Sequence, residues 1–203
     1  IAYLNYPFSY GMKEVDYVIS DPWLNGEKNA SYFDEKPLEM PSSFLTIGKY
    51  YVRDISSEPA RKKNGYLTFG SLNNIYKLNK KTIKLWSEIL HRVSNSKLYL
   101  NHPSLAAERA RDSILFEFSK SSISPERVVL AWEKSPTGSH LSFYNEFDIA
   151  LDALPLTGGT TTVDALWMGV PLVTLVGDAH AQRLSYSIMS NTGINMADCI
   201  AFD

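Results

Sequence analysis

Residues 147–171 read FDIALDALPLTGGTTTVDALWMGVP. A short apolar run, Ile149–Leu151, is followed by a turn that contains Gly158 and Gly159 and then by a segment with helical spacing. A strand that leads through a Gly-rich turn into a helix is typical of a parallel α/β sheet, where ligands bind beyond the carboxyl ends of the strands. This stretch therefore predicts the fold class and the edge of the sheet at which a ligand would bind.

The rest of residues 65–203 repeats the alternation of short apolar runs and longer amphipathic segments. We expect strands at Tyr66–Phe69, Lys97–Leu100, Val128–Ala131, Ile149–Leu151 and Leu172–Val176. We expect helices at Lys80–Val93, Leu105–Lys120 and Asp164–Met168, with Trp86 in the core. The single cysteine, Cys199, lies in an apolar stretch that we interpret as a buried strand over Cys199–Phe202. The pattern predicts a Rossmann-like sheet with helices on both faces.

Residues 1–64 have a different character, being rich in Pro and Tyr with one apolar run at residues 16–20. We interpret them as a linker or the remnant of a neighbouring unit, and residues 65–203 as the α/β domain. The chain begins at Ile1 and ends at Asp203 directly after an expected strand. We therefore expect that it is a piece cut from a longer protein.

Charge and composition argue against several classes of partner. Lys and Arg total 20 against 22 for Asp and Glu, a net charge of -2, so nothing favours nucleic acid or an anionic membrane. No apolar run reaches the roughly 20 residues of a membrane helix, and we expect a cytoplasmic protein. The histidines lack zinc spacing and no second cysteine could complete a site, so we expect no metal.

The Gly-rich turn is the strongest local signal for binding. Gly158 and Gly159 permit close approach of the backbone, and Thr160 and Thr161 add hydroxyl donors at the start of a helix, where N–H groups and the helix dipole suit phosphate. Asp164, four residues after Thr160, suits the vicinal hydroxyls of a ribose. The alternative is a plain tight turn with one Thr as the N-cap and Asp164 interacting with the helix N-terminus.

A second polar segment, Gly70–Lys77, follows the expected strand Tyr66–Phe69 and precedes a helix. Its side chains should face the same crevice as the Thr-rich turn, because both segments leave the carboxyl edge of the sheet. Lys77 could there neutralise a diphosphate leaving group. From local sequence alone, Lys77 could equally be an ordinary surface lysine.

Taken together, four ordered blocks resemble the C-terminal lobe of glycosyltransferase family 41, which contains O-GlcNAc transferase and SPINDLY. They read YPFSYGMKEVDYVISD, YFDEKPLEMPSSF, FGSLNNIYKL and DIALDALPLTGGTTTVDALWMGVPLVTLVGDAHAQR. The resemblance implies a GT-B enzyme, whose two Rossmann-like lobes hold a nucleotide sugar mainly in the C-terminal lobe without a metal. Residues 1–64 would then come from the region between the lobes.

The resemblance also implies a role for individual residues. Lys77, the candidate catalytic residue, matches the lysine at the donor diphosphate, and Asn74 stands on its phosphate side. Thr160 and Thr161 match threonines at the diphosphate, and Gly158 precedes them in the loop. Asp164 matches the ribose carboxylate and His140 a histidine beside the base.

Two positions depart from the family. Gly159 stands where O-GlcNAc transferase has a histidine, and Thr137 stands where a lysine contacts the base. The donor is therefore open between UDP-GlcNAc, UDP-glucose and a GDP-sugar.

For the intact protein we expect transfer of a sugar from such a donor to a protein Ser or Thr. The resemblance implies as partners the nucleotide-sugar donor, a protein acceptor, and an N-terminal lobe and TPR region that lie outside these residues. Without that lobe, we expect the chain alone to bind the donor weakly and not to transfer the sugar efficiently. The alternative is a non-catalytic Rossmann-like interaction module, which predicts no saturable nucleotide binding.

Overall fold

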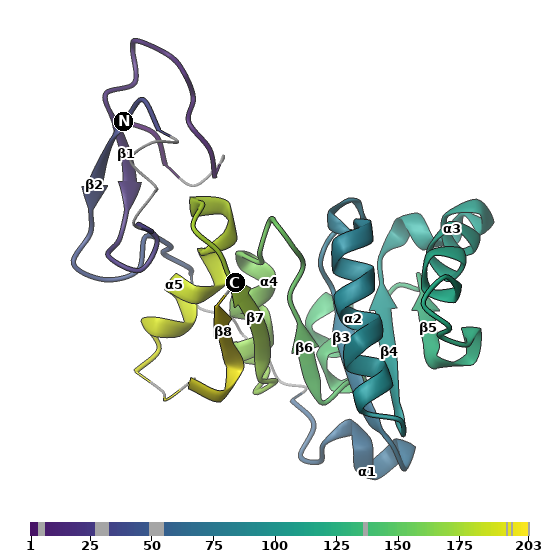
Figure 1. Cartoon of the computed structure of the whole chain (residues 1–203). Helices are drawn as coiled ribbons and strands as arrows, with labels where there is room; N and C mark the ends of the chain where they lie inside the picture. Colours follow the sequence, from purple (N-terminus) through teal and green to yellow (C-terminus); the bar gives the residue numbers. More distant parts are fainter. Residues whose placement is uncertain are drawn as a thin grey trace.

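The computed structural model describes residues 1–3, 7–26, 33–48, 55–135, 138–193, 195 and 197–202. Its main feature is a six-stranded parallel sheet with the order β5-β4-β3-β6-β7-β8 (Figure 1). The strands are β3 (Leu67–Ser71), β4 (Ser96–Asn101), β5 (Val128–Ala131), β6 (Ile149–Leu151), β7 (Leu172–Val176) and β8 (Ile200–Phe202). This is the order of a doubly wound Rossmann fold, in which the direction of winding reverses between β3 and β6.

Helices cover both faces of this sheet, as the alternating pattern predicts. They are α1 (Ala60–Asn64), α2 (Lys80–Arg92), α3 (Glu108–Ser119), α4 (Thr160–Trp167) and α5 (Leu184–Ser190). Short 3₁₀ turns lie between them, at η2 (Ile75–Lys77), η3 (Pro103–Ala106), η4 (Pro125–Arg127), η5 (His140–Glu146), η6 (His180–Gln182) and η7 (Ala197–Cys199). Helix α2 begins where the Asn79 side chain accepts hydrogen bonds from the first turn, an ordinary N-cap.

Alternate residues of each strand supply the two cores, because successive side chains point to opposite faces. On one face, Leu98 and Leu151 pack against Trp86 and Leu90 of α2 and against α3. On the other, residues such as Leu172 pack against η5, α4 and α5. Each fully buried leucine contributes about 1.5–3 kcal/mol relative to an exposed one. Trp86 lies within the first of these cores, as expected.

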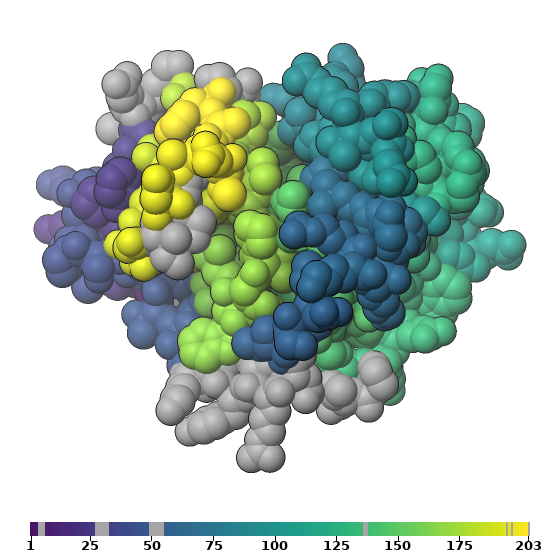
Figure 2. All heavy atoms as spheres, turned by 90° about the horizontal axis from the view of Figure 1, so that it is seen from below, coloured from purple at the N-terminus to yellow at the C-terminus, as the bar shows by residue number. Residues whose placement is uncertain are grey.

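The N-terminal segment forms a small sheet of its own, well apart from the large one in Figure 1. Strand β1 (Tyr17–Ser20) pairs in parallel with β2 (Lys36–Glu39), and Ala2 bridges to Val18 on the other side of β1. In Figure 2 the purple residues of this segment lie beside the yellow C-terminal residues and opposite the teal of α3.

The buried carboxylate of Asp21 joins this segment to the α/β domain. Its Oδ1 accepts from the N–H groups of Trp23 and Leu24, and its Oδ2 accepts from the N–H of Phe44 and the hydroxyl of Ser187 in α5. Leu24 and Phe44 pack with Ile188 of α5 in a third apolar cluster. Polar and apolar contacts therefore fix the segment to α5.

The structure confirms the five expected strands to within two residues at either end and corrects three other expectations. Helix α4 begins at Thr160 rather than at Asp164, because the Thr-rich run itself forms the first turn. Leu105 belongs to η3, and α3 begins only at Glu108. Cys199 is a half-buried residue of η7, outside the strand, and β8 is an edge strand whose Ala201 and Phe202 are exposed.

Candidate functional site

The two polar segments leave the sheet from neighbouring strands. β3 and β6 pair directly, with Phe69 beside Ile149 and Gly70 beside Ala150. A side chain at residue 70 would meet Phe147, since a Cβ there would lie 2.1 Å from its Cγ. Gly70 is thus required for Phe147 to cover β3. The carboxyl ends of β3 and β6 form the point where the winding reverses, which is the ligand crevice of a doubly wound sheet.

The buried carboxylate of Asp152, just after β6, organises the Gly-rich turn. Its Oδ1 accepts from the N–H of Gly158 at 2.8 Å and from the N–H of Ala153 at 2.9 Å. Its Oδ2 accepts from the hydroxyl of Thr174 in β7 at 2.8 Å. Burial raises the pKa of Asp152, and the hydrogen bonds from Thr174 and Gly158 and the charge of Lys77 are among the effects that oppose the rise. Asp152 therefore holds the turn in place.

The two glycines of the turn differ in the space around them. A Cβ at Gly158 would lie 2.4 Å from Oγ1 of Thr162 and 2.8 Å from Oγ1 of Thr161, so only glycine fits. A Cβ at Gly159 would meet nothing within 4 Å. The open space at Gly159 is where the resemblance places a histidine in O-GlcNAc transferase.

Helix α4 starts directly after Gly159 with no side-chain cap. The first N–H groups of a helix have no intrahelical acceptor, so those of Thr160 and Thr161 point toward the crevice as donors. Thr160 is exposed at this end, whereas the Thr161 hydroxyl donates to Oδ1 of Asn73 at 3.1 Å. The helix start thus offers backbone donors and one free hydroxyl.

Lys77 reaches across the crevice from η2. Its Nζ donates to Oδ1 of Asn73 at 3.0 Å and to the carbonyl oxygen of Thr157 at 3.0 Å. The side chain is half-buried, and burial lowers the pKa of Lys77 while Asp152 raises it. In the described part of the chain, neutral oxygens alone accept from this ammonium group, so its charge is not paired with a carboxylate.

Asn73 is a site residue that the sequence reasoning missed in favour of its neighbour Asn74. Asn73 is buried and links Lys77 to Thr161. The exposed Asn74 uses its Oδ1 to accept from the N–H of Tyr76 at 3.1 Å, as the N-cap of η2. The feature of the sequence that could have identified Asn73 is its position two residues beyond the end of β3.

His140 and Asp164 form a pair one turn further along α4. His140 Nε2 lies 3.0 Å from Oδ2 of Asp164, whose side chain is 3% exposed against 66% for His140. Oδ1 of Asp164 is buried and has no hydrogen-bond partner among the described residues. A buried carboxylate oxygen without a donor is costly, so this oxygen suits a hydroxyl donor from a ligand.

A hollow of about 520 Å³ continues from His140 across the ends of β3, β4 and β5. Its walls include the side chains of Leu72, His102, Trp132 and Phe143. The apolar and aromatic walls suit a planar ring. Thr137, the position of the family's base-contacting lysine, lies outside the described residues.

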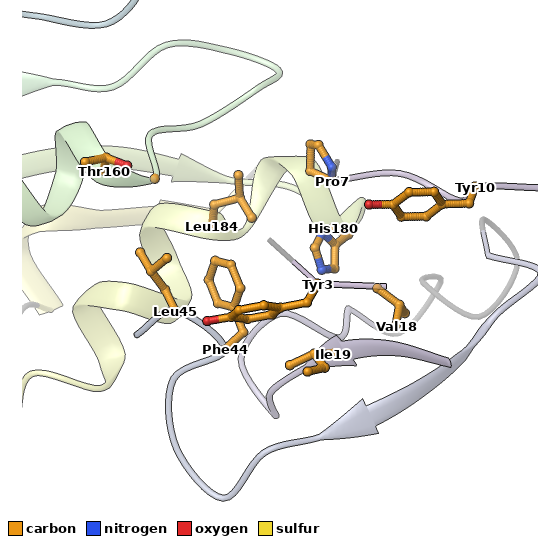
Figure 3. Close-up of a pocket in the computed structure, with 11 residues that line it drawn as sticks. Tyr3, Pro7, Tyr10, Val18, Ile19, Phe44, Leu45, Thr160, His180 and Leu184 are labelled. Atoms are coloured by element: carbon orange, nitrogen blue, oxygen red, sulfur yellow. The ribbon is translucent and has the colours of Figure 1, made fainter. Parts of the chain in front are cut away.

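A second cavity, of about 120 Å³, lies between the N-terminal segment and the α/β domain (Figure 3). It extends from Gly159 and Thr160 past Leu184 to His180 and Tyr10. In Figure 3 the hydroxyl end of Tyr10 points toward His180. Burial lowers the pKa of His180 to about 4, so its imidazole is neutral at pH 7.

The described residues contain no group of three His, Cys, Asp or Glu side chains that could hold a metal ion. Within the same ranges, no helix is both long and apolar enough to span a bilayer.

The chain forms a doubly wound α/β domain. Its crevice brings together Lys77, the first turn of α4 and the carboxylate of Asp164, one oxygen of which has no hydrogen-bond partner among the described residues. The model of glycosyl transferase family 41 matches residues 59–202. The probable UDP-N-acetylglucosamine–peptide N-acetylglucosaminyltransferases SPINDLY of Oryza sativa subsp. japonica and Solanum lycopersicum are both 30% identical over 96% of this chain, which covers 21% of each relative. The chain belongs to glycosyl transferase family 41 and spans about a fifth of the length of these relatives.

A solved structure agrees with this assignment over nearly the whole chain. A mutant of the Thermobaculum terrenum O-GlcNAc transferase superimposes with a TM-score of 0.87 at 25% identity, covering 98% of this chain and 37% of that one. Because 98% of this chain is covered, the superposition includes the N-terminal segment. The expected fold class, the lobe of a GT-B enzyme, is confirmed.

Proposed function

We propose that this chain is the donor-binding part of a protein O-glycosyltransferase that moves a sugar from a nucleotide to a protein Ser or Thr. The observation that carries the proposal is the ammonium of Lys77, which is half-buried at the crevice and, within the described residues, donates to neutral oxygens alone. A partly desolvated cation with no carboxylate in hydrogen-bond contact is stabilised when an anion binds. A nucleoside diphosphate supplies that anion.

The crevice provides a partner for each part of such a donor. Lys77, the hydroxyl of Thr160 and the N–H groups at the start of α4 face the diphosphate position. Oδ1 of Asp164, which lacks a donor in the described structure, suits a ribose hydroxyl, with His140 at its side. The hollow beyond His140 suits the base.

These groups act on the leaving group of the reaction. In the transfer, the acceptor oxygen bonds to the anomeric carbon of the sugar, the bond from that carbon to the diphosphate breaks, and the acceptor loses its proton. Negative charge grows on the departing diphosphate. Lys77 and the α4 N–H groups would stabilise that charge more in the transition state than in the bound donor, which accelerates transfer.

The donor sugar, the acceptor and the surroundings of this chain are parts of the same proposal. The names of the SPINDLY relatives specify UDP-N-acetylglucosamine and peptide, which supports such a donor and acceptor here. UDP-glucose and a GDP-sugar stay open. We also propose that an N-terminal lobe and a TPR region complete the enzyme, that it needs no metal, and that it is cytoplasmic.

Calorimetric titration of this chain with UDP and GDP in parallel tests the proposal. We expect saturable binding of one nucleotide, weakened at least about tenfold by both Lys77→Ala and Asp164→Ala, because each removes a charged contact. Circular dichroism checks that both variants are folded. Binding that neither substitution changes would show that the site is elsewhere. Failure of both nucleotides to bind is what a non-catalytic interaction module predicts, and the same titration on the full-length protein separates that alternative from a need for the N-terminal lobe.

A further inference from the structure

Asn73 occupies the centre of the crevice between the two polar segments. The residue is 6% exposed, and its Oδ1 accepts from Lys77 Nζ at 3.0 Å and from the Thr161 hydroxyl at 3.1 Å. Its amide nitrogen, Nδ2, donates to Oγ of Ser71 at 3.4 Å. Because an ammonium group and a hydroxyl both converge on one amide atom, that atom must be the oxygen.

We propose that Asn73 is a positioning residue that holds Lys77 and Thr161 across the crevice with a neutral acceptor, so that the Lys77 ammonium stays available to the donor diphosphate. This inference rests on the proposed function and adds a residue to it. The feature that matters is that the acceptor is neutral. A carboxylate in the same place could hold both donors equally well, but it would pair with the ammonium group and compete with the diphosphate.

The geometry also gives Thr160 and Thr161 different roles. The only hydroxyl proton of Thr161 is donated to Asn73. Thr161 therefore ties α4 to the segment after β3, and the diphosphate receives its donors from Thr160 and the backbone at the start of α4. Lys77 has three protons, of which Asn73 and the Thr157 carbonyl take two. No third acceptor is present within the described ranges, so the remaining proton is available to the ligand.

A pair of substitutions at this residue separates the charge effect from a merely structural role. Asn73→Asp keeps an acceptor of the same shape, whereas Asn73→Ala removes it. If neutrality matters, Asn73→Asp weakens nucleotide binding about tenfold or more, and by a larger factor than Asn73→Ala does. A purely structural role predicts the opposite order, since the alanine variant loses both hydrogen bonds.

The matched control is Asn64→Asp, which adds the same charge at the amino end of β3. The Asn64 amide donates to the hydroxyl of Thr68, at the end of β3 opposite to the crevice. We expect no change in nucleotide affinity for this control. An equal loss in Asn64→Asp and Asn73→Asp would mean that net charge alone weakens binding, which would overturn the proposal.

The pKa of Lys77 can be measured in the absence of nucleotide and gives a second test. Competitive acylation of the lysines over a range of pH, followed by mass spectrometry, measures the pKa of Lys77. We expect it to be higher in Asn73→Asp than in the unsubstituted chain, because the new carboxylate favours the charged amine. An unchanged value would overturn the proposal.

The two readouts distinguish failure of this inference from failure of the proposed function. If Lys77→Ala abolishes UDP or GDP binding but Asn73→Asp leaves both affinity and the Lys77 pKa unchanged, the inference is wrong and the donor site stands. If the pKa rises in Asn73→Asp but Lys77→Ala does not affect nucleotide binding, then Asn73 does hold Lys77, and the assignment of this crevice to the donor is wrong.

Discussion

At the scale of single residues, the chemistry of the site depends on Lys77. The resemblance alone could assign it to a diphosphate, but the structure adds the physical state of the group. Its ammonium is half-buried among neutral oxygens, and burial lowers its pKa. Partial desolvation of this charge reduces the stability of the unliganded protein, and a bound anion would restore the lost stabilisation.

Nucleotide binding should depend on pH through this amine. A bound diphosphate raises the pKa of Lys77, so binding takes up protons where the free site is partly neutral, and affinity falls as pH rises through the pKa of the free site. We expect this fall at a pH below the pKa of an ordinary lysine, about 10.4, because burial lowers the pKa of Lys77. Titrations in buffers of different ionisation enthalpy measure the proton uptake. Lys77→Met should abolish it, and uptake that persists in this variant would assign the effect to another group.

The two glycines of the turn offer a matched pair of substitutions. Gly158→Ala places a Cβ against the hydroxyls of Thr161 and Thr162, whereas Gly159→Ala places one in open space. We expect Gly158→Ala to cost about 1–3 kcal/mol in the free energy of unfolding and to weaken nucleotide binding. Gly159→Ala should change the stability little. Urea unfolding measures both, and equal losses would contradict the described packing of Gly158.

At the scale of elements, the connection from β6 to α4 determines the shape of the crevice. Asp152 binds the N–H groups of Ala153 and Gly158 and the hydroxyl of Thr174 in β7. The turn therefore takes its conformation from a buried carboxylate rather than from its glycines alone. Nothing in the local sequence pattern indicates that Asp152 has a partner, Thr174, on a neighbouring strand.

Asp152→Ala should loosen this turn. It leaves buried donors unsatisfied at a cost of about 1–3 kcal/mol in the free energy of unfolding, and we expect nucleotide affinity to fall as well. Asp148→Ala is the control, because Asp148 accepts from the N–H groups of Arg61 and Thr68 near the opposite end of β6. That variant should lose stability but, once folded, keep its affinity. Equal affinity losses would point to a global effect.

At the scale of the whole molecule, two structural units meet at α5. The small sheet of β1 and β2 is joined to the α/β domain by Asp21, whose carboxylate reaches Ser187 and the N–H of Phe44. The cavity of Figure 3 lies along this junction and ends at Gly159 and Thr160 of the candidate site. Movement of the N-terminal segment would therefore change one wall of the crevice.

Asp21→Ala should release the N-terminal segment while the α/β domain stays folded, since the six-stranded sheet has its own cores. Limited proteolysis with mass spectrometry should show faster cleavage before residue 55 and a persistent fragment that contains α2 to α5. Asp16→Ala, at an exposed position of the same segment, is the control and should be cleaved as slowly as the unsubstituted chain. Uniform degradation of the whole Asp21 variant would show that the two units unfold together.

The sequence by itself determined the fold class and most of the candidate site. Apolar periodicity indicates strands and helices because each buried face must repeat with the period of its element. The parallel topology then brings the carboxyl ends of β3 and β6 together. Lys77 and Thr161 do meet through one side chain, and His140 does contact Asp164, although their donor roles stay predictions.

The tertiary structure alone decided which of two adjacent asparagines enters the crevice. Asn73 and Asn74 have the same side chain and the same place after β3, so only the path of the backbone into η2 distinguishes them. Burial likewise depends on neighbours distant in sequence, which is why Cys199 is half-buried beside an exposed edge strand instead of within a buried strand. Local pattern determines the elements, because it acts through nearby residues. The electrostatic state of Lys77 depends on segments 80 residues apart, which only the folded chain brings together.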